Sequence, residues 1–200
     1  MFNAITIPST VFAALLSAMS MLTGAVASEP KPPMITPART LMDFRESNQI
    51  RGYAANDGVM DGLSWGTPKR QNDQLRFSGV LSLANNGGFS SVRTTDQTFD
   101  LSGVEALKLR VKGDGRSYQL RLATDARFRG SPVSYGATFP TQTDRWIEVR
   151  VPLDELTPSY RGYPLDGPTL DRSRVREIGL LIGDKREGPF TLWVDWIAAE

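Results

Sequence analysis

Short runs in which apolar and polar residues alternate occupy most of the chain beyond about residue 41, and this pattern constrains the fold more than any other feature. A period of two is typical of strands that bury one face, whereas an amphipathic helix repeats its apolar residues every three or four positions. The pattern therefore predicts an all-β chain. The clearest runs are Leu75–Leu83, Leu107–Val111, Tyr118–Leu122, Ile147–Val151 and Phe190–Trp196, with weaker strands expected at Leu41–Phe44, Gly88–Thr94 and Val133–Phe139.

Turn residues separate these runs and indicate how the strands connect. Gly113-Asp114-Gly115 predicts a hairpin because glycine adopts positive φ without a steric cost, and Asn86–Gly88 predicts a second tight connection. The continuously apolar Gly179–Ile182 predicts a strand buried on both faces, and only Leu153–Leu156 favours a short helical turn. Roughly nine short strands with Gly, Pro and Asp between them favour an antiparallel β-sandwich of the jelly-roll type.

The first 27 residues differ from the rest because they contain no Asp, Glu, Lys or Arg. The apolar stretch Val11–Leu22 is too short to cross a bilayer, which takes about 20 residues. Ala25 and Ala27 match the small-residue pattern that signal peptidases cleave. We therefore expect a signal peptide at 1–27 cleaved between Ala27 and Ser28, and an exported protein, periplasmic or secreted, without a transmembrane span after cleavage. A Pro-rich leader at 28–40 and a single domain at 41–200 would follow.

Two absences exclude several classes of site. The sequence contains no Cys and no His, which removes disulfides, thiolate nucleophiles, Cys/His zinc sites and Ser-His-Asp triads. No cofactor is expected. The formal net charge of +1 gives no reason to expect nucleic acid as a partner.

A first loop, residues 56–65, interrupts the alternation with polar groups and an aromatic side chain. Asp57 and Asp61 can offer oxygen ligands to a hard cation such as calcium, although the spacing matches no helix-loop-helix calcium site. The alternative is a turn whose side chains cap its own backbone. Both interpretations remain open at this point. The candidate binding residues are Asn56, Asp57, Met60, Asp61, Ser64 and Trp65.

A second loop, residues 85–93, offers amides and a cation. Asn85, Asn86 and Arg93 can hydrogen-bond a polyhydroxy ligand while an aromatic ring such as Trp65 stacks on a sugar face. The alternative is a turn followed by an amphipathic strand. Asp184 and Glu187 form a nominal carboxylate pair in a charged turn, where solvated side chains are expected. Further candidates for ligand or partner binding are Phe89, Arg161, Asp184 and Lys185.

Eleven short motifs occur in order from about Leu41 to Ile197. They are Asn56–Met60, Asn85–Phe89, Ser91–Arg93, Gly113–Gly115, Tyr118–Arg121, Trp146–Val149, Val151–Leu153, Arg161-Gly162, Gly179–Ile182, Asp184-Lys185 and Gly188–Phe190. The ordered set resembles the complex I intermediate-associated protein 30 family. The resemblance implies a galactose-binding-like jelly roll and a non-catalytic, chaperone-type role in assembling respiratory complex I.

Three functional hypotheses follow. The first is a non-catalytic assembly factor that binds a protein partner of the respiratory chain or one associated with a membrane. The second is an exported carbohydrate-binding module that uses the two loops and Trp65 to bind a glycan. The third, an enzyme with Asp57 or Asp61 as acid or base, has the least support, because no pair of carboxylates is recognisable across a cleft. We therefore expect no enzyme activity and no catalytic residues.

Overall fold

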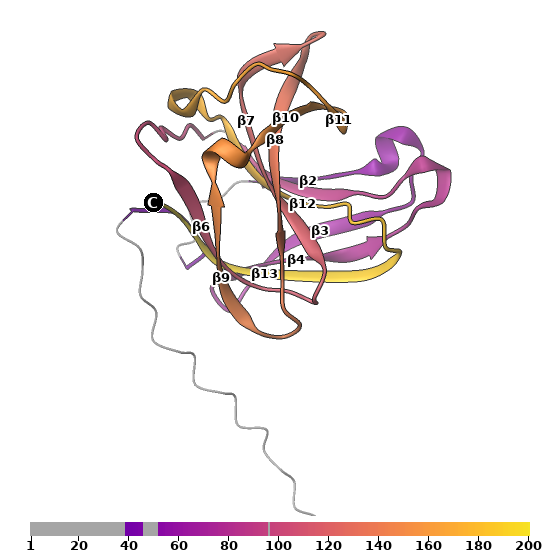
Figure 1. Cartoon of the computed structure of the whole chain (residues 1–200). Coiled ribbons are helices and arrows are strands. Elements are labelled where there is room, and N and C mark those ends of the chain that lie inside the picture. Colours follow the sequence, from indigo (N-terminus) through magenta and orange to yellow (C-terminus); the bar gives the residue numbers. More distant parts are fainter. Residues whose placement is uncertain (1–38, 46–51, 96) are drawn as a thin grey trace, which may run out of the picture. The chain divides into compact units, whose positions relative to one another are not determined.

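Two antiparallel sheets are built from the part of the chain that the computed structural model describes, residues 39–45, 52–95 and 97–200 (Figure 1). The first sheet has the order β3-β4-β13-β6-β9, with β1 paired to the end of β13 beside β4. Its long strand β13, yellow in Figure 1, lies at the centre. The bounds are β1 Arg39–Asp43, β3 Trp65–Gln71, β4 Gln74–Leu81, β6 Ala106–Lys112, β9 Trp146–Pro152 and β13 Gly188–Ala199.

The second sheet has the order β11-β10-β8-β7-β12-β5-β2. Its inner face packs on the first sheet, while its outer face carries polar side chains, so its strands alternate as the sequence predicts. The bounds are β2 Gly52–Asn56, β5 Ser90–Thr94, β7 Ser117–Phe128, β8 Ser131–Pro140, β10 Thr157–Tyr160, β11 Tyr163–Pro164 and β12 Glu177–Ile182. The 3-10 turns are η1 Asp57–Met60, η2 Ala84–Asn86, η3 Leu153–Glu155 and η4 Arg172–Arg174.

The core fills the space between the sheets with the apolar members of each alternating run. Phe77 of β4 meets Phe190 of β13 edge to face, with ring centroids 5.0 Å apart, and both side chains are buried. On the opposite sheet Tyr118 and Phe139 stack at 6.3 Å. These contacts confirm the all-β jelly-roll sandwich, the expected strand positions and the short helical turn at Leu153.

The hairpin predicted at Gly113–Gly115 is wrong, and the predicted connection at Asn86–Gly88 is present but does not join two paired strands. The turn Gly113-Asp114-Gly115 joins β6 of the first sheet to β7 of the second, and the connection through Asn86–Gly88 likewise joins β4 to β5 across the sandwich. Glycine-rich turns signal a sharp change of direction, but whether the next strand pairs with the previous one depends on distant strands. Both turns therefore lie at places where the chain changes sheet.

Three other turns make the true hairpins, and each has two successive residues with positive φ. Asn72 and Asp73 (φ 53° and 57°) join β3 to β4, and Arg129-Gly130 (φ 50° and 79°) joins β7 to β8. The third, Arg161-Gly162 (φ 49° and 84°), joins β10 to β11. Positive φ at both central positions matches the right-handed twist of paired strands.

Strands β2 and β3 are not anticipated by the alternation. β3 carries Gly66 and Pro68, residues that usually argue against a strand, but it lies at an edge where proline removes no needed donor. β12 also differs from expectation, because only its inner face lies in the core. Its Gly179 is buried on the outer side by the Arg93 side chain, and Leu181 is half-buried.

The predicted signal peptide and nearly all of the leader lie outside the described residues. Within the described part of the chain, no helix is long and apolar enough to cross a membrane.

Candidate functional site

A buried carboxylate ties the first loop to the second. Asp57 is the first residue of η1, and its side chain is fully buried. Its Oδ1 accepts a hydrogen bond from the Ser64 backbone N–H at 2.9 Å. Its Oδ2 accepts from the backbone N–H groups of Gly88 at 2.6 Å and Phe89 at 3.3 Å. One side chain therefore fixes two loops that leave different sheets.

Two glycines make room for this carboxylate. A Cβ atom at Gly62 would lie 2.3 Å from the Asp57 Cγ, and one at Gly87 would lie 2.6 Å from its Oδ2. Both distances are far below ordinary van der Waals contact. The two loops close around Asp57 only because neither glycine carries a side chain.

The hydrogen bonds set the protonation state of Asp57. Burial alone would raise the pKa of this carboxyl group, but the bonds from Ser64, Gly88 and Phe89 favour the charged form. The net effect holds the pKa of Asp57 below its ordinary value of 3.8. Asp57 is therefore an ionised structural clamp at neutral pH, since its oxygens already face three donors.

The amides of both loops are also engaged. Asn56 accepts from the Ser90 hydroxyl at 2.6 Å, and Asn85 donates to the Asp61 carbonyl at 2.9 Å. The Asp57–Ser64 bond lies within the first loop, as a self-capped turn would require, whereas the bonds of Asn56 and Asn85 join the first loop to β5 and to the second loop. Among the residues that the structure describes, no group of three or more His, Cys, Asp or Glu side chains lies together as a metal site would require. Left-handed backbone occurs at the exposed residues Asp61, Asn85 and Asn86.

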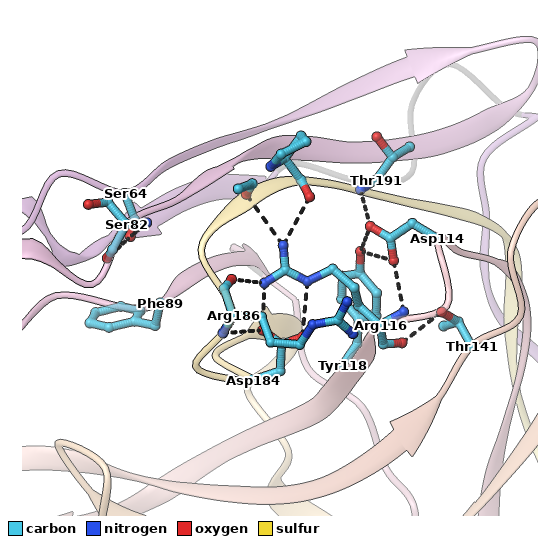
Figure 2. A network of polar contacts seen from close by, with 12 residues as sticks. Ser64, Ser82, Phe89, Asp114, Arg116, Tyr118, Thr141, Asp184, Arg186 and Thr191 are labelled. Carbon is cyan, nitrogen blue, oxygen red and sulfur yellow. Dashed lines mark hydrogen bonds and ion pairs between the residues drawn. The ribbon is translucent and has the colours of Figure 1, made fainter.

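The turn after β12 is held by a second buried charge (Figure 2). The Arg116 guanidinium binds Asp184 through both carboxylate oxygens, with Nη2–Oδ1 at 2.5 Å and Nε–Oδ2 at 3.0 Å. It also donates to the carbonyls of Gly188, Pro189 and Arg186. The expectation of solvated carboxylates in this turn is thus wrong for Asp184, because Arg116, the residue before β7, binds it from 68 positions away in the sequence.

Burial would raise the pKa of Asp184, but the hydrogen bonds from Arg116 and the Arg186 backbone, together with the charges of both arginines, hold the pKa below its ordinary value. Beside this pair, Asp114 accepts from the Thr191 backbone at 2.8 Å and from the Tyr118 hydroxyl, as Figure 2 shows. The Glu187 side chain accepts from the Leu83 backbone at 2.9 Å, which links this turn to the second loop.

The remaining candidates lie apart from this cluster or at its margin. Lys185 is exposed in the same turn as Asp184, with φ of 59°. Arg161 belongs to the β10–β11 hairpin, where its guanidinium carbon lies 5.4 Å from the Tyr160 ring centroid. Met60 is the last residue of η1.

Apolar side chains project into solvent at the end of the sandwich where the two loops meet. Leu63 is 62% exposed, Trp65 55% and Leu83 40%. The Ser64 hydroxyl donates to the Ser82 carbonyl and accepts from the Ser82 N–H, both at 3.0 Å, so the segments that carry these side chains are held together. We call Leu63, Trp65 and Leu83 the apolar tip.

Trp65 and Arg93 do not meet at one surface. Gly66 faces the core beside Phe77 and Phe190, so its neighbour Trp65 faces outward from the first sheet. Arg93 lies on the outer face of the second sheet, where it pairs with Glu177 at 3.0 Å. The sugar platform expected from these two residues is therefore not assembled.

Several residues that shape this end of the molecule escaped the sequence interpretation. Leu63 and Leu83 carry a local signal, since each is an apolar residue beside a polar loop. Arg116 carries none, because its partner Asp184 lies 68 residues away in the sequence.

Comparison with known proteins identifies relatives of the whole domain. A sequence model of the family described as Complex I intermediate-associated protein 30 matches residues 42–194. The Mus musculus protein named Complex I intermediate-associated protein 30, mitochondrial, is 33% identical in an alignment 187 residues long that covers 80% of this chain and 55% of that protein. The Drosophila melanogaster protein of the same name is 25% identical in an alignment 126 residues long that covers 56% of this chain and 43% of that protein. The chain thus spans about half the length of these curated relatives.

Solved structures share the fold. The family 11 carbohydrate-binding module of Clostridium thermocellum, in complex with a β-1,3-1,4-mixed-linked tetrasaccharide, superposes with a TM-score of 0.61 at 14% identity, covering 80% of this chain and 94% of that one. A family 30 carbohydrate-binding module gives 0.54 at 19% identity, covering 81% and 90%. At these identities the likeness concerns the β-sandwich alone.

The relatives correct one expectation and confirm another. Both animal relatives are named as mitochondrial, so the expected periplasmic or secreted location is wrong. The prediction rested on an apolar, uncharged stretch followed by Ala-x-Ala. This pattern reflects composition and does not by itself specify the compartment to which a protein is sent. The family resemblance read from the ordered motifs is confirmed: this chain belongs to the complex I intermediate-associated protein 30 family.

Proposed function

We propose that the chain is a non-catalytic protein-binding factor in the assembly of respiratory complex I, and that the apolar tip contacts its partner. Membership of the family supports the assembly role. The domain supplies a rigid sandwich, and the partner-binding surface lies on loops that the sandwich holds in place.

The exposure of Trp65 on immobilised loops carries this proposal. A large aromatic side chain left in water gains binding energy when a partner buries it, and tryptophan is enriched among the residues that dominate interface energies. The Asp57 clamp and the Ser64–Ser82 hydrogen bonds fix the backbone on both sides of the tip. A pre-ordered loop loses less entropy on binding, so its contacts contribute more to affinity.

The use of the buried acids supports a non-catalytic role. The carboxylate of Asp57 accepts hydrogen bonds from three backbone N–H groups, and the carboxylate of Asp184 is paired with Arg116. Both pKa values lie below the ordinary value, whereas a general acid needs a raised pKa. The hypothesis that Asp57 acts as acid or base has no support in this geometry.

Affinity capture from the native host tests the proposal. The full chain should retain subunits or assembly intermediates of complex I, and Trp65→Ser should weaken the binding about thirtyfold, since losing an interface tryptophan costs about 2 kcal/mol or more. Tyr163→Ser is the matched control, because Tyr163 is 74% exposed on β11, away from the apolar tip. If Trp65→Ser and the wild type recover equal amounts of partner, the apolar tip is not part of the interface. Capture of glycans in place of proteins would favour the carbohydrate-binding alternative.

A further inference from the structure

A row of five residues crosses the outer face of the second sheet, one residue from each of five neighbouring strands. The pairing register aligns Tyr53 of β2, Arg93 of β5, Gly179 of β12, Arg121 of β7 and Gly136 of β8. These residues face away from the core because their chain neighbours on β5, β7 and β12 are buried in it. The row therefore places two arginines on one sheet face with glycines beside them.

Neutral acceptors hold Arg121 in a fixed orientation. Its Nη1 donates to Gln119 Oε1 at 2.8 Å, its Nε to the Ser134 hydroxyl at 2.9 Å and its Nη2 to the Ser159 hydroxyl at 3.1 Å. A guanidinium group has five N–H donors. Within the described residues, the other two donors of Arg121 have no hydrogen-bond acceptor. The side chain is thus pre-oriented, and two of its donors remain for a ligand.

The charge of Arg121 is not neutralised by the described part of the protein. The acid in this cluster, Glu177, pairs with Arg93 at 3.0 Å and also accepts from the Tyr53 hydroxyl at 3.1 Å. No carboxylate of the described residues lies within ion-pair distance of Arg121. Burial lowers the pKa of Arg121, and the charge of Arg93 lowers it further, yet an arginine stays protonated at neutral pH. This half-buried cation therefore lies beside a second cation without an anion of its own.

The two glycines make room on the sheet face for the arginine side chains. A Cβ at Gly136 would lie 2.8 Å from the Arg121 Cδ, and a Cβ at Gly179 would lie 3.1 Å from the Arg93 Cγ. With hydrogen in those places, both arginine stems lie flat along the sheet. A side chain at either position would push the guanidinium groups away from the acceptors that orient them.

We propose that Arg121 binds a carboxylate in an acidic segment of the protein partner, an inference that rests on the proposed function. A planar guanidinium with two remaining donors matches the two oxygens of a carboxylate. Neutral glycans are bound by stacking on aromatic rings, and the row has no aromatic residue next to Arg121. Charge is therefore the chemistry that this face offers, and an acidic peptide segment can lie over the arginine side chains that cover the glycines.

An NMR titration of the full chain with acetylated hexaglutamate tests this site. The Arg121 Nε–Hε signal should shift on binding, and the affinity should fall with added salt because the contact is ionic. Arg121→Gln should weaken hexaglutamate binding at least about tenfold, the effect of losing a charge-assisted bidentate contact. Arg145→Gln is the matched control, because this exposed arginine lies in the β8–β9 connection and the substitution removes the same charge.

A second variant separates position from charge. Gly136→Ala keeps every charge but forces the flexible Arg121 stem to move, so it should weaken the same binding while the thermal midpoint stays close to wild type. Hexaglutamate binding that is absent, or equal in Arg121→Gln and wild type, would overturn the proposal. Binding of oligogalacturonate without binding of hexaglutamate would overturn it in favour of an acidic glycan. The proposed function is unaffected by these results if Trp65→Ser still reduces partner capture, so the failure of one proposal can be told from the failure of the other.

Discussion

At the scale of single residues, the side chains with the largest structural effect are charged groups removed from water. A buried carboxylate is costly unless hydrogen bonds compensate it, and Asp57 receives three from backbone donors that would themselves be left unsatisfied. The first loop, which in the sequence resembled a cation-binding loop, is instead held by these hydrogen bonds to the Asp57 carboxylate. The amide-rich composition of both loops reflects the same need, since Asn56 and Asn85 bond to partners within this loop region.

Asp57→Asn should destabilise the protein by about 2 kcal/mol at pH 7, because an amide NH₂ would then face backbone donors. The folded-state pKa of Asp57 lies below the ordinary value of 3.8, so its stabilising effect is complete above that value and is lost as the pH falls through the folded-state pKa. Urea unfolding from pH 7 to pH 2 should therefore show the two proteins converging at acidic pH.

Asp61→Asn is the control for this effect, since Asp61 is exposed in the same loop with a left-handed backbone that Asn tolerates. Its unfolding free energy should match wild type at each pH. A constant difference between Asp57→Asn and wild type across the whole range would contradict the role assigned to the ionised carboxylate.

At the scale of elements, the local pattern determines which segments become strands but not which strands pair. The alternation at Leu107–Val111 and Tyr118–Leu122 correctly marks β6 and β7, yet these strands belong to different sheets. Pairing involves strands that lie more than a hundred residues apart in the sequence, such as β4 with β13, and no local window contains that information. The three observed hairpins instead depend on two adjacent residues with positive φ.

Two substitutions in these hairpins should have opposite effects. In Gly130→Ala the added Cβ meets no neighbouring atom, so any loss of stability comes from the positive φ of 79° alone. We expect the free energy of unfolding to fall by about 1 kcal/mol. Asp73→Gly relieves the same strain at φ of 57° and should leave stability equal or raise it by up to about 1 kcal/mol. Thermal unfolding measures both; a Gly130→Ala protein as stable as wild type would show that this turn does not constrain the hairpin.

At the scale of the whole molecule, the sandwich separates two surfaces that the sequence interpretation combined. The apolar tip, which includes Trp65, lies at the end where the loops meet. The row that contains Arg93 and Arg121 lies on the outer face of the second sheet. Trp65 and Arg93 could be selected from the sequence because each lies beside a conspicuous loop. Arg121 could not, because on its own strand it is one more polar residue in an alternating run, and its isolation from acids arises only when five strands are assembled.

The level of assembled complex I in host cells that lack this chain tests the central claim most directly. Native gel electrophoresis should show a loss of the mature complex and an accumulation of partial assemblies. Wild-type chain and the Tyr163→Ser control should restore the complex, whereas Trp65→Ser should restore it poorly. A normal amount of active complex I in cells without the chain would contradict the account.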